Sequence, residues 1–172
     1  HINRSNSINN LIKKNKFNSI FRSDSYNIKK EDTFFIVDTF GELGLFFKLS
    51  NLAIVGGSLV KKGGHNPIEA ESFNCPLICG PNMQNFSEIA EKMKKEKAGF
   101  FLENCNDLEK QISYLLENPK IIKLTIKNFK KLCKFEKSRS IIKTCWNETE
   151  HERNTNETTT TTTASKQASN ET

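Results

Sequence analysis

Long apolar runs are missing from this sequence of 172 residues. A helix that crosses a bilayer needs about 20 consecutive apolar residues, so the sequence predicts no transmembrane segment. An N-terminal apolar stretch with a cleavage site is missing too, and we expect no export signal in the chain as given. Because the chain begins at His1 rather than at a methionine, we interpret it as part of a longer protein or as a processed product.

The cysteines lack the spacing of a metal or redox site. Their number is odd, and no two of them are separated by two residues, the arrangement found in zinc and thioredoxin-like sites. Cys75 and Cys79 flank an apolar segment, so we expect them to be buried and to act as small hydrophobic residues. These features are typical of a protein in the reducing cytosol, and we expect no metal and no cofactor. The five cysteines are Cys75, Cys79, Cys105, Cys133 and Cys145.

Signatures of nucleic-acid binding are also lacking. The sequence contains no zinc-finger, RNA-recognition or helix-turn-helix pattern, and aromatic residues do not alternate with basic ones on a predicted strand. Residues 1–146 nevertheless carry 24 basic and 15 acidic residues. Such a surplus suits an anionic partner, but the lysines equally suit the solvent faces of helices. Charge therefore leaves the partner open, and we expect no nucleic acid.

Residues 147–172 differ in composition from the rest of the chain. Apolar residues are rare there, and Thr158–Thr163 is an uninterrupted threonine run. Such a segment buries too little apolar surface to offset the entropy of ordering. We predict a disordered tail rich in Thr, Asn and Glu, following one domain over residues 1–146.

The body alternates short apolar runs with amphipathic stretches. This alternation is typical of a parallel sheet with helices on both faces, so we predict a Rossmann-like α/β domain. The expected strands are 33–38, 52–56, 76–80 and 98–102, with an edge strand at 17–21, and the expected helices are 7–16, 41–49, one beginning near Pro67, 85–95, 107–116 and 120–143.

Three loops follow predicted strands, at 38–42, 56–69 and 80–86. Ligands of parallel α/β domains bind beyond the carboxyl ends of the strands, so we expect a site there. Helix N-termini carry free amides and a positive dipole end that suit phosphate. Asp38 or Thr39 is a candidate cap for the first of these helices, Glu42 suits its dipole, and Asn85 is the expected N-cap after the third loop.

The middle loop is the most informative. Its two Gly-Gly pairs allow a ligand to approach the backbone, but they form neither a Walker loop nor G-x-G-x-x-G. Asn66 and Pro67 are typical of an N-cap and a first helical position. Glu69 then either completes a capping box, which the spacing favours, or accepts hydrogen bonds from ribose hydroxyls. His65 either packs the loop or contacts a ligand anion.

Four segments together resemble one family, the 3-deoxy-D-manno-octulosonic acid (Kdo) transferases of lipopolysaccharide assembly. The order and spacing fit over about residues 1–145. The resemblance implies a GT-B architecture, in which two Rossmann-like domains face each other across a cleft, with this chain as the second, donor-binding domain. The segments are DTFGELGL at 38–45, VGGSLV at 55–60, GGHNPIE at 63–69 and GPNMQNF at 80–86.

The resemblance also implies site residues. Residues 40–42 stand where the family has a Met-Gly-Glu that contacts CMP, and residues 66–69 match the family's Asn-Pro-Leu-Glu at the same nucleotide, which favours Glu69 as a ligand. His1 matches a histidine that contacts CMP after a Pro-Arg pair absent here. The implied CMP residues are Phe40, Gly41, Glu42, Asn66, Pro67, Ile68 and Glu69, with Ser58, Gly64 and His65 as further candidates.

The implied reaction is an inverting, metal-free transfer of Kdo from CMP-Kdo to a lipid A precursor. A carboxylate of the first domain would be the base, so no catalytic residue is assigned here, and we expect the isolated chain to bind CMP or CMP-Kdo weakly and to transfer nothing. The expected partners are CMP-Kdo, the lipid A precursor, the N-terminal GT-B domain and, through the parent protein, the membrane surface. The parent is expected at the cytoplasmic face of the bacterial inner membrane, and the fragment in the cytoplasm as a soluble protein.

Two alternatives remain open at the level of sequence. One is a UDP-sugar-using GT-B glycosyltransferase or epimerase domain, which shares the topology and a ribose-binding glutamate. The other is a non-catalytic nucleotide-binding module, such as a decayed gene fragment.

Overall fold

The computed structural model describes residues 4–24 and 27–138. They form two compact units that divide between Leu43 and Gly44. The predicted tail at 147–172, His1 and the last residues of the predicted helix 120–143 lie outside the described residues. The prediction of a single domain over 1–146 stays a prediction.

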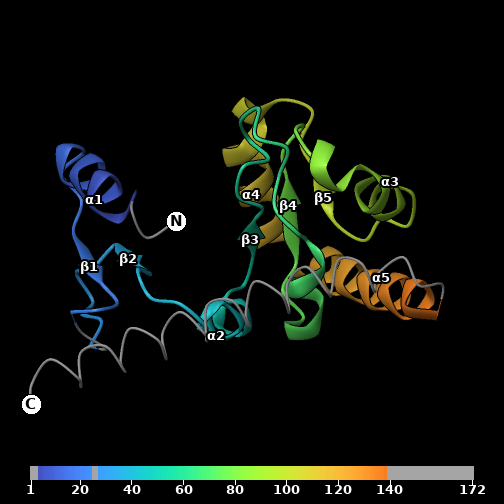
Figure 1. Cartoon of the computed structure of the whole chain (residues 1–172), viewed down its shortest axis with the longest axis horizontal. Coiled ribbons are helices and arrows are strands. Elements are labelled where there is room, and N and C mark those ends of the chain that lie inside the picture. The colour runs from blue at the N-terminus through green and yellow to red at the C-terminus, as the bar shows by residue number, and fades with distance from the viewer. Residues whose placement is uncertain (1–3, 25–26, 139–172) are drawn as a thin grey trace, which may run out of the picture. The chain divides into compact units, whose positions relative to one another are not determined.

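The first unit consists of α1 (Ser5–Lys14), β1 (Ser19–Phe21) and β2 (Phe34–Ile36) (Figure 1). The two strands pair in parallel, with Ile20 opposite Phe35, and α1 packs against both of them. The helix ends two residues earlier than predicted because Lys16 adopts a left-handed conformation, with φ of 62°, a geometry that cannot continue a right-handed helix.

The second unit is built on a sheet of β3 (Ala53–Ile54), β4 (Leu77–Cys79) and β5 (Phe100–Phe101), with β4 in the centre. All pairs are parallel, and Ile78 lies opposite Ile54 on one side and Phe100 on the other. The ladder continues past the strands, since the N–H of Val55 donates to the carbonyl of Ile78 at 2.9 Å. The predicted parallel α/β class is confirmed, although the strands pair as two sheets rather than as the expected single one.

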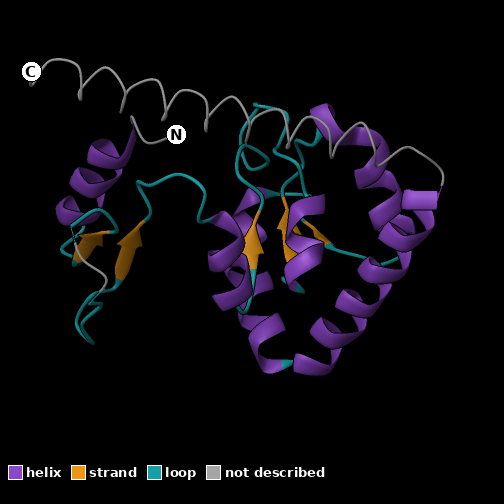
Figure 2. Ribbon diagram, turned by 60° about the horizontal axis from the view of Figure 1, so that its bottom comes forward, coloured by secondary structure: helices purple, strands orange, loops and turns teal. Residues whose placement is uncertain are grey.

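Helices cover both faces of the three-stranded sheet (Figure 2). Leu77 and Cys79 belong to one apolar cluster, whereas Ile78 belongs to a second cluster with Leu115, because successive side chains of a strand point to opposite faces. The remaining elements are α2 (Leu43–Leu49), α3 (Ser87–Lys95), α4 (Leu108–Glu117), α5 (Pro119–Ser138) and the short 3-10 helices η2 (Ile68–Phe73), η3 (Gln84–Phe86) and η4 (Cys105–Asp107).

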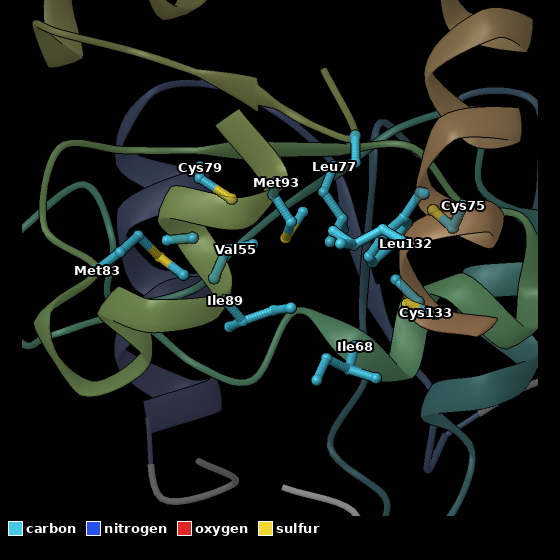
Figure 3. Close-up of a cluster of buried hydrophobic side chains, with 14 residues drawn as sticks. Val55, Ile68, Cys75, Leu77, Cys79, Met83, Ile89, Met93, Leu132 and Cys133 are labelled. Carbon is cyan, nitrogen blue, oxygen red and sulfur yellow. The ribbon is translucent and has the colours of Figure 1, made fainter. Parts of the chain in front are cut away.

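The larger apolar cluster lies between β4 and the helices α3, α5 and η2 (Figure 3). Met93 of α3 is completely buried in it, and burial of such a side chain contributes about 1.5–3 kcal/mol. Cys75, Cys79 and Cys133 are buried there as free thiols, which confirms the interpretation of Cys75 and Cys79 as hydrophobic residues. Burial raises the pKa of the Cys79 thiol to about 12.

Further differences from the expected helices concern the one near Pro67 and α3. The helix near Pro67 is the 3-10 helix η2, and it ends before Asn74, where the backbone is left-handed with φ of 57°. Helix α3 begins at Ser87, and Asn85 lies inside η3. Within residues 4–24 and 27–138, no helix is long and apolar enough to span a membrane.

Candidate functional site

The loops that follow β3 and β4, residues 56–69 and 80–86, are hydrogen-bonded to each other. The N–H of Asn85 donates to the carbonyl of Gly63, and the N–H of Asn82 donates to the carbonyl of Ser58, both at 3.0 Å. The prediction that these two loops meet at one edge of the sheet is therefore confirmed within the second unit.

Ser58 lies at the centre of this contact and is completely buried. Its hydroxyl donates to the carbonyl of Val55 at 2.6 Å and accepts from the N–H of Gly80 at 2.8 Å. The side-chain amide of Asn82 reaches the carbonyl of the same serine at 3.2 Å. The structure thus places this further candidate for CMP binding beneath the loop surface, in a structural role.

The second Gly-Gly pair packs against the neighbouring loop. A Cβ added to Gly63 would collide with the side chain of Asn85, and one added to Gly64 would stand 2.6 Å from the Sδ of Met83. Both glycines are buried. Their small size is therefore needed for loop packing, a reason that the sequence did not reveal, and a role of Gly64 in CMP binding stays a prediction.

His65 is exposed, and its Nδ1 lies 2.6 Å from the carbonyl oxygen of Gly56. Because a carbonyl can only accept, Nδ1 carries the hydrogen, and Nε2 is then an acceptor in the neutral ring. The loop-packing role of His65 is confirmed. Its contact with a ligand anion stays a prediction.

Asn66 caps η2, as predicted from the Asn-Pro pair. Its Oδ1 accepts from the N–H of Ile68 at 3.0 Å, so this amide is already used. Pro67 and Ile68 are buried, and Glu69 is half-buried. η2 is a 3-10 helix of six residues rather than the expected α-helix, and a phosphate site at its start stays a prediction.

In the first unit, the carboxylate of Glu42 is held by two side chains. Its Oε1 lies 2.6 Å from the Nη2 of Arg22, and its Oε2 accepts from the hydroxyl of Thr39. These interactions, with Thr39 contributing most, hold the pKa of Glu42 below its usual value. Arg22 was missed at the level of sequence, although a basic residue directly after the predicted strand 17–21 was a usable signal.

The residues around Glu42 also differ from the expected caps. Helix α2 begins at Leu43, so neither Asp38 nor Thr39 caps it. The carboxylate of Asp38 instead accepts from the N–H of Ser23 at 3.0 Å and from its hydroxyl at 2.6 Å, and these bonds lower the pKa of Asp38.

Phe40 and Gly41 are exposed. They are the other two residues that the resemblance assigns to CMP in this loop. Apart from its two chain neighbours, no atom of residues 4–24 and 27–138 lies within 4 Å of a Cβ added to Gly41, so the backbone is open to that extent.

Among the described residues, no three His, Cys, Asp or Glu side chains gather into a group that could hold a metal ion. The expectation of a metal-free reaction stays a prediction. The candidate residues are described within each unit by itself. In the first unit they lie in the loop of Glu42, and in the second they lie in the hydrogen-bonded loops 56–69 and 80–86.

Comparison with known proteins relates the chain to one family. No family model matches the sequence. A Haemophilus influenzae protein named 3-deoxy-D-manno-octulosonic acid transferase is 39% identical over 120 residues, which are 69% of this chain and 28% of that protein. An Aquifex aeolicus protein of the same name is 36% identical over 109 residues, 63% of this chain and 31% of that one.

The fold points to the same family. The crystal structure of the C-terminal CMP-Kdo binding domain of WaaA from Acinetobacter baumannii matches with a TM-score of 0.74 and 25% identity, covering 77% of this chain and 69% of that one. The chain is related to the 3-deoxy-D-manno-octulosonic acid transferases. It spans less than a third of the length of the transferases named above, and within this family its fold corresponds to the C-terminal domain.

Proposed function

We propose that the chain is the donor-binding part of a Kdo transferase. It binds CMP-Kdo, and the whole protein transfers Kdo to a lipid A precursor during lipopolysaccharide assembly at the cytoplasmic face of the bacterial inner membrane. The observation that carries the proposal is the likeness in fold to a CMP-Kdo binding domain over 77% of the chain, together with 39% identity to a named transferase.

The proposed CMP contacts are considered within each unit by itself. In the first, Glu42 is the acceptor, beside Phe40 and Gly41. In the second, the segment 66–69 contributes Glu69, and His65 is a further contact. Both glutamates keep part of their surface accessible, which supports a role in accepting hydrogen bonds from a nucleotide.

The proposed chemistry is an inverting, metal-free transfer. Negative charge grows on the CMP phosphate as the glycosidic bond breaks, and donors fixed around it would stabilise that charge. The base that deprotonates the acceptor hydroxyl belongs to a domain outside the given sequence. No residue of this chain therefore moves the proton, and the chain alone transfers no sugar.

The test is calorimetric titration of the full 172-residue chain with CMP and with UDP. We expect CMP to bind more tightly than UDP, and Glu69→Gln and Glu42→Gln each to weaken CMP binding roughly 10-fold, since a hydrogen bond to a charged group contributes about 1.5–3 kcal/mol. Glu103→Gln, at an exposed glutamate of the second unit, is the control and leaves affinity unchanged.

Other results of the titration and of a transfer assay would support different functions. Preference for UDP would support a UDP-sugar-using domain, and absence of nucleotide binding would overturn the proposal. Kdo transfer by the chain alone would show that the base lies inside it. If CMP binds but the parent protein with its flanking sequence transfers nothing, the chain is a non-catalytic module.

A further inference from the structure

Both oxygens of the Glu42 carboxylate are held by side chains of the first unit. Arg22 contacts Oε1 at 2.6 Å, and the hydroxyl of Thr39 donates to Oε2. The two donors come from different segments, since Arg22 directly follows β1 and Thr39 follows β2. The orientation of the carboxylate is therefore fixed from two sides.

Arg22 is itself fixed at both ends. Its backbone N–H donates to the carbonyl of Ile36 at 2.8 Å, at the end of β2. Its side chain is only 8% exposed, whereas that of Glu42 is 25% exposed. Arginine is almost never buried to this extent unless it is paired. The guanidinium therefore supports the carboxylate from the protein side, and the carboxylate retains contact with solvent.

The carboxylate keeps capacity for another donor. An ionised carboxylate offers about four lone-pair sites, and the contacts to Arg22 and Thr39 use two of them. A glutamate is ionised near neutral pH, and the contacts to Thr39 and Arg22 lower the pKa of Glu42 further. Chain neighbours aside, the described residues leave the backbone at Gly41 open. An acceptor already held in place loses less side-chain entropy when it binds a ligand.

We propose that Arg22 and Thr39 are positioning residues, which hold the Glu42 carboxylate in the orientation that accepts a hydrogen bond from the bound nucleotide. This inference rests on the proposed function, in which Glu42 contacts CMP. The competing explanation is that the three side chains only stabilise the fold of the first unit. In that case their loss would lower the melting temperature but leave the CMP affinity of the folded protein unchanged.

The experiment is a CMP titration of the full chain with thermal unfolding of every variant. Thr39→Val keeps the shape and removes the hydroxyl, Thr39→Ser restores it, and Thr33→Val changes an exposed threonine as a control. We expect Thr39→Val to weaken CMP binding about fivefold, the size of one ordinary hydrogen bond. Thr39→Ser should bind within about twofold of the original chain, and Thr33→Val should not differ from it.

A double variant shows whether Thr39 acts through Glu42. We expect Thr39→Val combined with Glu42→Gln to bind CMP no more weakly than Glu42→Gln alone, because residues that share one interaction are not additive. Arg22→Lys cannot make the same planar contact, so it should also weaken CMP binding. Combined with Glu42→Gln, it should cause no further loss. If Arg22→Lys fails to fold, the Thr39 variants still test the positioning role.

The results distinguish the positioning role of Arg22 and Thr39 from the proposed donor-binding function. If the original chain binds CMP and Glu42→Gln weakens it, but Thr39→Val binds normally, the positioning role is overturned and the donor-binding function stands. Additive losses in the double variant would also overturn it. If the original chain does not bind CMP, both the proposed function and this inference fail.

Discussion

The N–H of Gly80 donates a hydrogen bond to the hydroxyl of Ser58 across 2.8 Å. Gly80 directly follows the central strand β4, and Ser58 lies in the loop that follows the neighbouring strand β3. A Cβ added to Gly80 would collide with the backbone of Ser58. One buried contact therefore joins the two loops that the proposed donor site shares in the second unit.

Replacing Ser58 by alanine should destabilise the protein. The change leaves the N–H of Gly80 buried without its partner, and such a group costs about 1–3 kcal/mol. We expect the free energy of unfolding from urea titration to fall by that amount. Ser113→Ala, at an exposed position of α4, should change it by less than about 0.5 kcal/mol. Equal effects of the two variants would contradict the structural role of Ser58.

Two glycines allow conformational strain and steric packing to be measured separately. Gly41 and Gly63 have nearly equal φ of 80° and 83°, so alanine at either position carries a left-handed penalty of about 1–2 kcal/mol. Only at Gly63 does the added methyl group also meet a neighbour, Asn85. We expect Gly63→Ala to lower the free energy of unfolding more than Gly41→Ala.

The steric part at Gly63 can be tested by removing the neighbour. Adding Asn85→Ala to Gly63→Ala should return part of the lost stability, because the side chain that the methyl group meets is then shortened. A double variant that is less stable than the sum of the single variants would argue against this packing.

Adjacent leucines of α4 provide a matched test of the second apolar cluster. Leu115 is 0% exposed and Leu116 is 59% exposed. Leu115→Ala should lower the free energy of unfolding by about 2–5 kcal/mol through lost burial and a cavity, whereas Leu116→Ala should change it by less than about 0.5 kcal/mol. Chemical denaturation of both variants checks this, and a larger loss at Leu116 would show that α4 is turned the other way.

The Glu42 contacts predict a pH dependence. The folded pKa of Glu42 is lowered, mainly by Thr39 and then by Arg22, so the ionised group contributes stability above its unfolded pKa of about 4.3. That contribution is lost as the pH falls through the folded pKa. We therefore expect the loss of unfolding free energy caused by Thr39→Val to be largest near neutral pH and to shrink in acid.

Urea titrations of the original chain, Thr39→Val and Thr33→Val between about pH 3 and pH 7 measure this dependence. The Thr33→Val curve should stay parallel to that of the original chain. A Thr39→Val effect that is independent of pH would mean that the hydroxyl does not stabilise the charged form of Glu42.

The sequence was sufficient to predict the order of elements in the second unit. The strand that became β4 is flanked by Pro76 and Gly80 and is apolar throughout, as a strand covered on both faces must be. The pairing of the strands as two sheets could not be predicted, because hydrophobic periodicity does not specify which strands pair. The 3-10 form of η2 could not be predicted either, because the Asn66-Pro67 start indicates a helix but not its type.

The candidate site was predictable in position more than in function. The Asn66 cap followed from local chemistry and is present. The roles of Ser58, Gly63 and Gly64 depend on what lies opposite them in space, namely the loop 80–86, and no spacing rule gives that. Arg22 and Glu42 are 20 residues apart in sequence, so their ion pair required the fold.

Gly63, Gly64 and Gly80 are needed for the packing of the loops 56–69 and 80–86 against each other. A related protein that binds no nucleotide would still need small residues at 63, 64 and 80, since otherwise the two loops could not pack against each other. The presence of these glycines in another protein therefore indicates that its two loops pack in this way. It does not indicate which ligand, if any, that protein binds. Substitutions at Glu69, which is half-buried, would test the proposed ligand contact more directly than substitutions at these glycines.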